Sequence, residues 1–445
     1  MADVHDPVEL EPWSDVLADH ERRLPDQVEY LAEHSAFYGR RFEEWGVEPG
    51  DVRSLADLRE LPFTTKDDER AAQDDAPPDR PLGEHQAAPT AALNRVISSS
   101  GTTGRPTYFG LTERDRRDWN TVLQRCFHTA GIRPDDTVLF GPTQTMITGG
   151  TPYFEGLTAL GANVVPAGGG STERLLSVGL DLHADVLFST TSHVRYLAER
   201  VEAVAGVTPA EFPTDKVVGG AAPGIANPEI RRELYDAWDA TLVREIMGLG
   251  DVIGCLWAEC EAEAGMHYHG QGHAHVELID PQTGEAIGFE DGAEGELVYT
   301  HLRREATPLL RFRSGDVARV VGTDCGCGRT SPRIQCIGRT DEMLIYKGMN
   351  VYPSAVRDVV AGLDGLAPRL RVVVPPGVVN FETPIPIEVA LEPGADREAA
   401  EAVEAVREAV RERLQVQVDP TVVAAEELGP GEYKTALVEE REPDA

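Results

Sequence analysis

The chain has 445 residues, 41% of them hydrophobic, which is enough for two or three domains with a sizeable core. Its 76 acidic residues outnumber the 41 lysines and arginines, and the resulting net charge of −35 disfavours binding to nucleic acid or to an anionic membrane. Such self-repulsion is screened at high ionic strength, so we expect a halophilic protein of a salt-rich cytoplasm, the alternative being an acidic protein with no need for salt.

Neither a membrane span nor a secretory signal is expected. No run approaches the roughly 20 apolar residues that cross a bilayer. The first residues, MADVHDPVELEPW, lack a basic segment followed by an apolar one. We therefore expect a cytoplasmic location and no membrane partner.

The N-terminal part of the chain has two patterns. Residues 1–65 place apolar side chains such as Val28, Leu31 and Phe37 at helical spacing, which predicts helices. The following stretch, Asp67 to Pro89, is acidic and rich in alanine and proline, which predicts a solvated surface loop.

Short apolar runs then alternate with helical patterns up to about residue 240. The runs lie at 137–141, 162–168, 184–190 and 215–220. Buried strands separated by helices predict a parallel α/β sheet. Residues 274–322 instead alternate apolar and polar side chains between turns, which predicts a β-rich part with antiparallel strands.

A smaller unit is expected at the C-terminal end. Strand-like runs at 369–376 and 385–391 and an amphipathic helix near 396–415 predict a compact α+β domain of about 100 residues. We place the large region at 1–340 and this small domain at 341–445.

The strongest local signal is the segment SSSGTTGRPT, from Ser98 to Thr107. Hydroxyl side chains and glycines give a flexible turn rich in O–H and N–H donors, which the oxygens of a polyphosphate require. The Gly-Lys-Ser/Thr ending of a Walker loop is absent, and a plain turn is the alternative. The candidate phosphate-binding residues are Ser98, Ser99, Ser100, Gly101, Thr102, Thr103 and Gly104.

This segment resembles the phosphate loop of the adenylate-forming superfamily of acyl-CoA synthetases, adenylation domains and luciferases. Residues 148–174 (TGGTPYFEGLTALGANVVPAGGGSTER) and 338–356 (GRTDEMLIYKGMNVYPSAV) are similar to its phenylacetate–coenzyme A ligase branch. The resemblance implies an α/β fold with a β-rich subdomain, followed by a mobile α+β lid, and a homodimer. It also implies that ATP and Mg²⁺ convert a carboxylic acid, aromatic in this branch, to an acyl-adenylate, from which coenzyme A displaces AMP.

Four residues take roles from the resemblance. Asp316 ends the motif FRSGD and is expected to accept hydrogen bonds from both ribose hydroxyls. Arg339 corresponds to an arginine that helps to hold the nucleotide, and Asp341 to the hinge before the lid. Lys434 matches the catalytic lysine, a cation that stabilises the charge developing at the α-phosphorus.

The nucleotide motif departs from the family pattern, aromatic-Gly-x-Ser/Thr-Glu, and reads MGLGD. Beside Gly248, Met247 replaces the ring that is expected to stack on adenine, and Gly250 replaces the hydroxyl residue. Asp251 is a shorter Mg²⁺ ligand than the usual glutamate. Ala222 stands where relatives often carry an acidic residue facing the base. These changes leave altered, weak or lost activity open.

Cysteines and histidines in two loops point to a structural metal. Cys260 and His267 are seven residues apart, and Cys325 and Cys327 lie in DCGCGR, so the four predict a closed Cys₃His zinc site. Some members of this branch are similar here. The competing ligands are His269, His273 and Cys255, and the alternative to a metal is a set of buried thiols and surface histidines.

We therefore expect an AMP-forming acid–CoA ligase whose acid pocket lies near Tyr153, Phe154 and residues 220–222. The loop 346–353, with Gly348, is expected to line the thiol tunnel. Two alternatives stay open. One is an adenylyltransferase acting on another acceptor, such as a deazaflavin cofactor, and the other is a nucleotide- or acyl-adenylate-binding homologue that has lost turnover.

Overall fold

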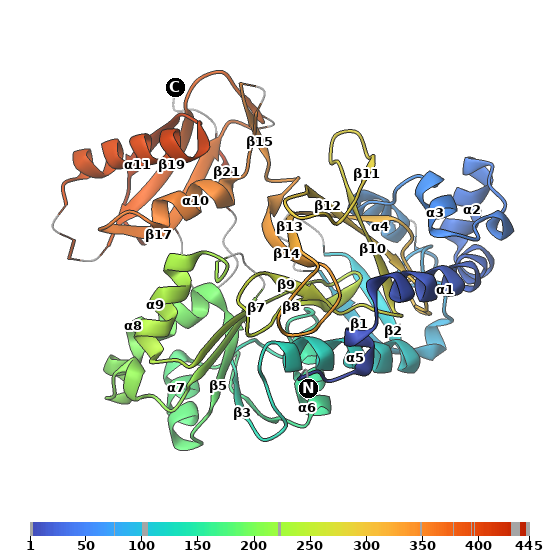
Figure 1. Cartoon of the computed structure of the whole chain (residues 1–445), viewed down its shortest axis with the longest axis horizontal. Coiled ribbons are helices and arrows are strands. Elements are labelled where there is room, and N and C mark those ends of the chain that lie inside the picture. Colours follow the sequence, from blue (N-terminus) through green and yellow to red (C-terminus); the bar gives the residue numbers. More distant parts are fainter. Residues whose placement is uncertain are drawn as a thin grey trace.

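The computed structural model contains a large body with a smaller C-terminal unit beside it, drawn in orange and red in Figure 1. Elements and contacts refer to the residues that the structure describes. These are 3–74, 76–99, 106–220, 224–347, 349–376, 378–392, 394–395, 397–428 and 437–441. Among them, no helix is both long and apolar enough to cross a membrane.

The N-terminal residues form helices that pack on the β-rich part of the body (Figure 1), and the prediction of helices in 1–65 is confirmed. The side chain of Ser35 caps the second helix, which ends at Gly46 in a left-handed conformation. Leu31 and Tyr38 share a core with Leu310. The helices are α1 (Trp13–His34), α2 (Ala36–Trp45), α3 (Leu55–Glu60) and α4 (Lys66–Asp74).

The prediction of a solvated loop from Asp67 to Pro89 is wrong. Its first part is α4, and Leu82 and His85 further on are buried. The side chain of Gln73 in α4 donates to the carbonyl of Tyr108 at 2.6 Å and accepts from its N–H at 3.1 Å. Contacts with residues distant in the sequence therefore order a segment whose composition is that of a loop.

A single sheet of twelve strands runs through the large body of the described chain. The four predicted apolar runs form or contain its parallel strands β3, β4, β5 and β6, so the predicted α/β sheet is confirmed. The parallel strands are β3 (Thr137–Phe140), β4 (Asn163–Pro166), β5 (Val186–Thr190), β6 (Lys216–Gly220) and β7 (Leu242–Leu249). The helices of this half are α6 (Thr151–Leu160), α7 (Thr172–Asp181), α8 (Thr191–Ala205) and α9 (Pro228–Trp238).

The same sheet continues as an antiparallel half, and the antiparallel strands predicted in 274–322 are confirmed. Strand β14 pairs with both β13 and β9, which joins the β-rich part to the parallel half. The strands are β8 (Ile253–Glu259), β9 (Met266–Tyr268), β10 (Ala274–Ile279), β11 (Ala286–Ile287), β12 (Glu294–His301), β13 (Phe312–Gly322) and β14 (Arg333–Arg339).

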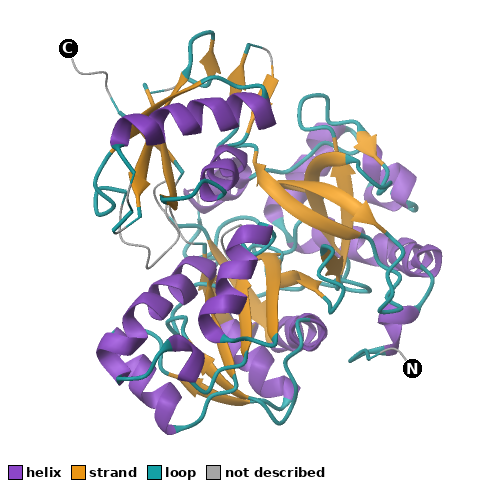
Figure 2. Ribbon diagram, turned by 60° about the vertical axis from the view of Figure 1, so that its left-hand side comes forward, coloured by secondary structure: helices purple, strands orange, loops and turns teal. Residues whose placement is uncertain are grey.

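The C-terminal unit has a hydrophobic core of its own, which includes Val356, Val389 and Val406. Figure 2 shows its long helix lying over its strands. Ala402, Val406 and Val410 of that helix are buried, as the amphipathic pattern predicted. A domain boundary near residue 341 stays a prediction. The elements are β15 (Leu344–Tyr346), β16 (Met349–Val351), α10 (Pro353–Ala361), β17 (Leu366–Val374), β18 (Asn380–Phe381), β19 (Ile385–Leu391), α11 (Ala399–Leu414), β20 (Val418–Val422) and β21 (Val438–Glu440).

The join between α1 and the sheet contains two buried histidines, His20 and His275, whose Nδ1 atoms lie 3.3 Å apart. The N–H of Gly272 donates to Nε2 of His20 at 3.2 Å, so Nδ1 of His20 carries the ring hydrogen in the neutral state. Burial lowers the pKa of His20 to about 4 and also lowers that of His275. Both rings are therefore neutral in the folded protein at neutral pH.

We expect this pair to make the protein sensitive to acid. The unfolded chain takes up protons near pH 6.5 and the folded chain does not, so stability is full above pH 6.5 and is lost as the pH falls toward 4. In His20→Gln the slope of unfolding free energy against pH should drop by about 1.4 kcal/mol per pH unit in that window. Urea unfolding at a series of pH values and constant salt measures this slope. An unchanged slope in His20→Gln would contradict the conclusion that His20 is neutral in the folded protein.

Candidate active site

The predicted phosphate loop joins the two strands of a hairpin, β1 (Leu93–Ser98) and β2 (Tyr108–Thr112). The N–H of Ser98 donates to the carbonyl of Met146 at 2.9 Å. Ser99 and Thr107 close the base of the loop, because the N–H and the hydroxyl of Thr107 both donate to the Ser99 hydroxyl at 3.0 Å. The predicted Ser100, Gly101, Thr102, Thr103 and Gly104 lie outside the described residues.

The MGLGD motif lies at the turn between β7 and β8. Met247 is half-buried and packs against the main core. Gly248 is the residue that fits its place, because a Cβ there would lie 2.0 Å from the carbonyl oxygen of Gly254. The side chain of Asp251 is almost fully buried at the end of the motif.

Asp251 is paired with a residue that the sequence did not single out, Lys66 at the start of α4. The ammonium of Lys66 also lies 3.1 Å from Glu69, which is buried, while Lys66 keeps 28% of its side chain exposed. Among the residues that the structure describes, neither ring nitrogen of buried His85 has a hydrogen-bond partner, and the charges of Lys66 and Asp251 act on its ring. One cation and two carboxyl groups thus meet beside the hairpin.

The electrostatics of this cluster follow from its burial. Burial lowers the pKa of Lys66, but the charges of Asp251 and Glu69 outweigh it and the net shift is upward. Burial, with the charge of Asp251, raises the pKa of Glu69 to about 8. Two carboxylates this close resist ionising together, so Glu69 is the one that keeps its proton at neutral pH.

The sheet brings Asp316 and Arg339 together, because they are register partners on β13 and β14. Nη1 of Arg339 donates to Asp316 Oδ1 at 2.6 Å, and Nε and Nη2 of the same guanidinium donate to Asp341 at 2.9 and 3.0 Å. Arg339 therefore holds the predicted ribose ligand and the predicted hinge residue at once. Ala222, Gly348 and Lys434 lie outside the described residues.

Two residues expected around the acid pocket, Tyr153 and Phe154, are both partly buried and pack against the main core. The hydroxyl of Tyr153 donates to the carbonyl of Gly254 at 2.6 Å, and its ring packs edge-on against Phe127 and Phe188. Phe154 packs on Phe140 and is only half-buried. Tyr153 thus supports the turn that carries the MGLGD motif, and its ring packs against the core.

The four predicted zinc ligands come together from three segments. Cys260 follows β8, His267 lies in β9, and Cys325 and Cys327 lie in the loop between β13 and β14. All four ligand atoms lie within 4.8 Å of one another, with Cys260 Sγ 3.6 Å from Cys325 Sγ and Cys327 Sγ 3.4 Å from His267 Nε2. Zn–S bonds of about 2.3 Å in a tetrahedron require separations near 3.8 Å, so the donor set fits zinc.

The three competing ligands have other neighbours. The thiol of Cys255 lies 3.5 Å from the carbonyl oxygen of Trp257. Nδ1 of His269 is 3.6 Å from Glu9, and Nδ1 of His273 is 3.9 Å from Asp118. Within the described residues, none of them belongs to the cysteine cluster.

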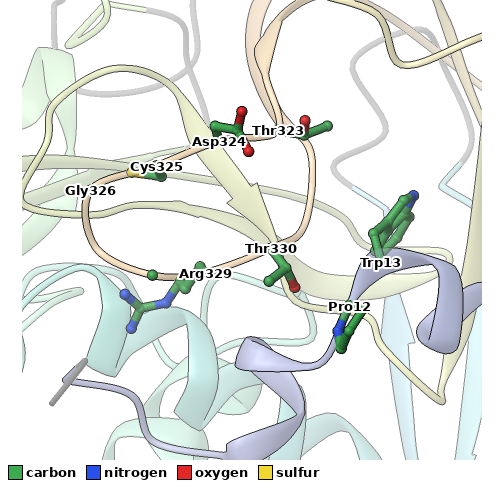
Figure 3. Close-up of a pocket in the computed structure, with 9 residues that line it drawn as sticks. Pro12, Trp13, Thr323, Asp324, Cys325, Gly326, Arg329 and Thr330 are labelled. Atoms are coloured by element: carbon green, nitrogen blue, oxygen red, sulfur yellow. The ribbon is translucent and has the colours of Figure 1, made fainter.

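The loop that carries Cys325 and Cys327 is fastened to the N-terminus. The N–H of Arg329 donates to Cys327 Sγ at 3.5 Å, and its side chain donates to buried Glu9 at 2.7 Å. A cavity of about 590 Å³ lies between this loop and Pro12 and Trp13 at the start of α1 (Figure 3). None of its lining residues belongs to the nucleotide motifs, so we assign it no part in the reaction.

Comparison with known proteins points to one kind of enzyme. A phenylacetate-coenzyme A ligase of Thermus thermophilus is 35% identical over 423 residues, which cover 93% of this chain and 92% of that protein. A phenylacetate-coenzyme A ligase of Aromatoleum evansii is 34% identical over 82% of this chain and 79% of its own length. No model of a known protein family matches the chain.

A solved structure is similar over nearly the whole chain. 2-Hydroxyisobutyryl-CoA ligase in the postadenylation state with 2-HIB-AMP matches 98% of this chain and 91% of its own, at 26% identity and a TM-score of 0.88. The same enzyme with 2-HIB-AMP and CoA in the thioesterification state gives a TM-score of 0.70. The structure of this chain therefore superposes better on the postadenylation structure of that enzyme than on its thioesterification structure.

Proposed function

Because the chain belongs to the phenylacetate–coenzyme A ligase family and is an AMP-forming acid–CoA ligase, we propose that its acid substrate is aromatic, phenylacetate or a close relative. The observation that carries this proposal is identity of 35% with a phenylacetate-coenzyme A ligase along 93% of the chain. Another acceptor, or a binding protein without turnover, is not favoured, because the curated relatives bear the names of ligases.

The nucleotide would be held by two parts of the large body, the β13–β14 pair and the loop between β1 and β2. Asp316, positioned by Arg339, is the proposed acceptor for the ribose hydroxyls, since both carboxylate oxygens can accept from a vicinal diol. Ser98 and Ser99 begin the loop that would surround the phosphates. Lys434 is the proposed cation at the α-phosphorus, where charge develops as the carboxylate attacks.

The cluster of Asp251, Glu69 and Lys66 is the proposed phosphate end of the site. Asp251 is the proposed Mg²⁺ ligand of this cluster, since Mg²⁺ in proteins is bound through carboxylate oxygens. Bound Mg²⁺ would supply charge that neutralises the polyphosphate. We propose that Lys66 contacts phosphate oxygens too, because α4 is hydrogen-bonded through Gln73 to Tyr108 at the end of the phosphate loop.

Cys260, His267, Cys325 and Cys327 are proposed to hold a structural Zn²⁺. Four protein ligands saturate a tetrahedral ion and leave no position for a substrate, so the metal would stabilise the fold and take no part in the chemistry. Hydrogen bonds from Cys260 and His267 lower the pKa of Cys327, and the contact with Cys327 raises the pKa of Cys260, so the two cysteines share one proton when no metal is bound.

Pyrophosphate release with ATP·Mg²⁺ tests the proposed substrate. The assay takes arylacetic, aryl and short aliphatic acids in turn, each with and without CoA, in molar KCl because a net charge of −35 favours a salt-rich cytoplasm. We expect release with arylacetic acids, and AMP and thioester only when CoA is present. Release with aliphatic acids alone would refute the aromatic substrate, and silence in folded protein would refute the activity itself.

A further inference from the structure

The hydroxyl missing from the MGLGD motif is replaced in space by one from another loop. A Cβ built on Gly250 would lie 2.4 Å from Oγ1 of Thr148 and 3.5 Å from its Cβ. A Cβ on Gly254 would lie 2.3 Å from Cγ2 of the same threonine. The side chain of Thr148 therefore fills the space between the two glycines and places its hydroxyl beside position 250.

Thr148 belongs to a loop that contacts the base of the predicted phosphate loop. Ser98 donates to the carbonyl of Met146 and forms a β-bridge with Ile147, so Thr148 follows directly on residues paired to that loop. Gly250, which lies beside the Thr148 hydroxyl, directly precedes Asp251 in the sequence. Within the described part of the chain the Thr148 hydroxyl makes no hydrogen bond, so it is available to a ligand.

We propose that Thr148 is a catalytic residue of the adenylation step. Its side chain supplies the hydroxyl donor that position 250 lacks. The inference rests on the proposed nucleotide site. Negative charge grows on the oxygens of the α-phosphate as the carboxylate attacks, and a fixed O–H donor beside the motif stabilises that charge. Position 250 must then be glycine, because a larger side chain would clash with the Thr148 hydroxyl. On this proposal the motif has kept its function.

Four variants separate this role from packing. Thr148→Val keeps the shape and removes the hydroxyl, and Thr148→Ser keeps the hydroxyl. Gly250→Ser should clash with Thr148, whereas Thr148→Ala/Gly250→Ser removes that clash, with the two Cβ atoms 3.5 Å apart and Phe109 Cζ 3.3 Å from the new Cβ. Thr158→Val, an exposed threonine on α6, is the matched control. Each is compared by acid-dependent pyrophosphate release, by thioester formation from supplied acyl-adenylate, and by thermal unfolding.

We expect Thr148→Val to slow pyrophosphate release about 10- to 100-fold, the range for a hydrogen bond to a charged group. Thioester formation from supplied acyl-adenylate and thermal stability should stay near wild type, as should Thr158→Val in all three assays. Thr148→Ser should recover most of the rate, and the double variant should exceed both Thr148→Val and Gly250→Ser.

Two results would overturn the inference and can be told apart. An active wild type with Thr148→Val at the same rate, or a double variant no faster than its parents, would leave the ligase in place and remove the hydroxyl role. A folded wild type that releases no pyrophosphate with any acid would remove the proposed function, and the role of Thr148 with it.

Discussion

Replacing Lys66 by methionine is expected to slow acid-dependent pyrophosphate release by about 100-fold or more, the loss typical of removing one preorganised electrostatic contact from a transition state. Lys66 is the cation paired with Asp251 and Glu69, and its helix is hydrogen-bonded to the end of the phosphate loop. Methionine keeps most of the length of the side chain without its charge. Thioester formation from supplied acyl-adenylate should change little, because pyrophosphate has left by then.

Lys216 offers a matched control for Lys66. It is another of the chain's four lysines and is ion-paired with Asp136 at 2.6 Å. It lies at the first residue of β6, at the opposite end of that strand from Gly220. Lys216→Met should therefore cost stability without slowing pyrophosphate release. Equal rates for Lys66→Met and wild type, with lowered thermal stability of the variant, would show that Lys66 is only a structural counter-ion of Asp251.

The order of the motifs and the type of each half of the sheet could be predicted from the sequence. Buried parallel strands are continuous apolar runs and antiparallel strands alternate, and both patterns are local. Cysteine spacing likewise placed Cys325 and Cys327 in one loop. What joins distant parts of the chain was not predictable, such as the pairing of β14 with β9 that continues one half of the sheet into the other.

The cluster around Asp251 shows the physical reason. Lys66 and Asp251 are 185 residues apart, and α4 carries mostly charged and polar side chains, so no apolar periodicity marked it as part of a site. The sole signal was the scarcity of lysine in the chain. Gly250 was interpreted as the loss of a hydroxyl for the same reason, since a compensating side chain 102 positions earlier has no local signature.

Removal of zinc is the second change with a large expected effect. Chelation, or Cys327→Ser, should lower the free energy of unfolding by about 4 kcal/mol or more, the stabilisation given by a ligand present at 1,000 times its Kd. The metal would link the end of β8, β9 and the loop before β14, which are otherwise joined by short strand pairings and by Arg333, whose side chain donates to the carbonyls of Ala264 and Asp324. Metal content and urea unfolding measure the effect.

The matched control for Cys327→Ser is Cys336→Ser, a partly buried cysteine outside the cluster. It should retain one zinc per chain, and Cys327→Ser should retain less. Because Arg329 links Cys327 to Glu9, loss of the metal should also free the N-terminal segment, which limited proteolysis near residues 3–12 would detect. Wild-type protein without zinc but of unchanged stability would contradict the metal site. Pyrophosphate release per folded molecule should survive zinc loss, because the ion has no open position for a substrate.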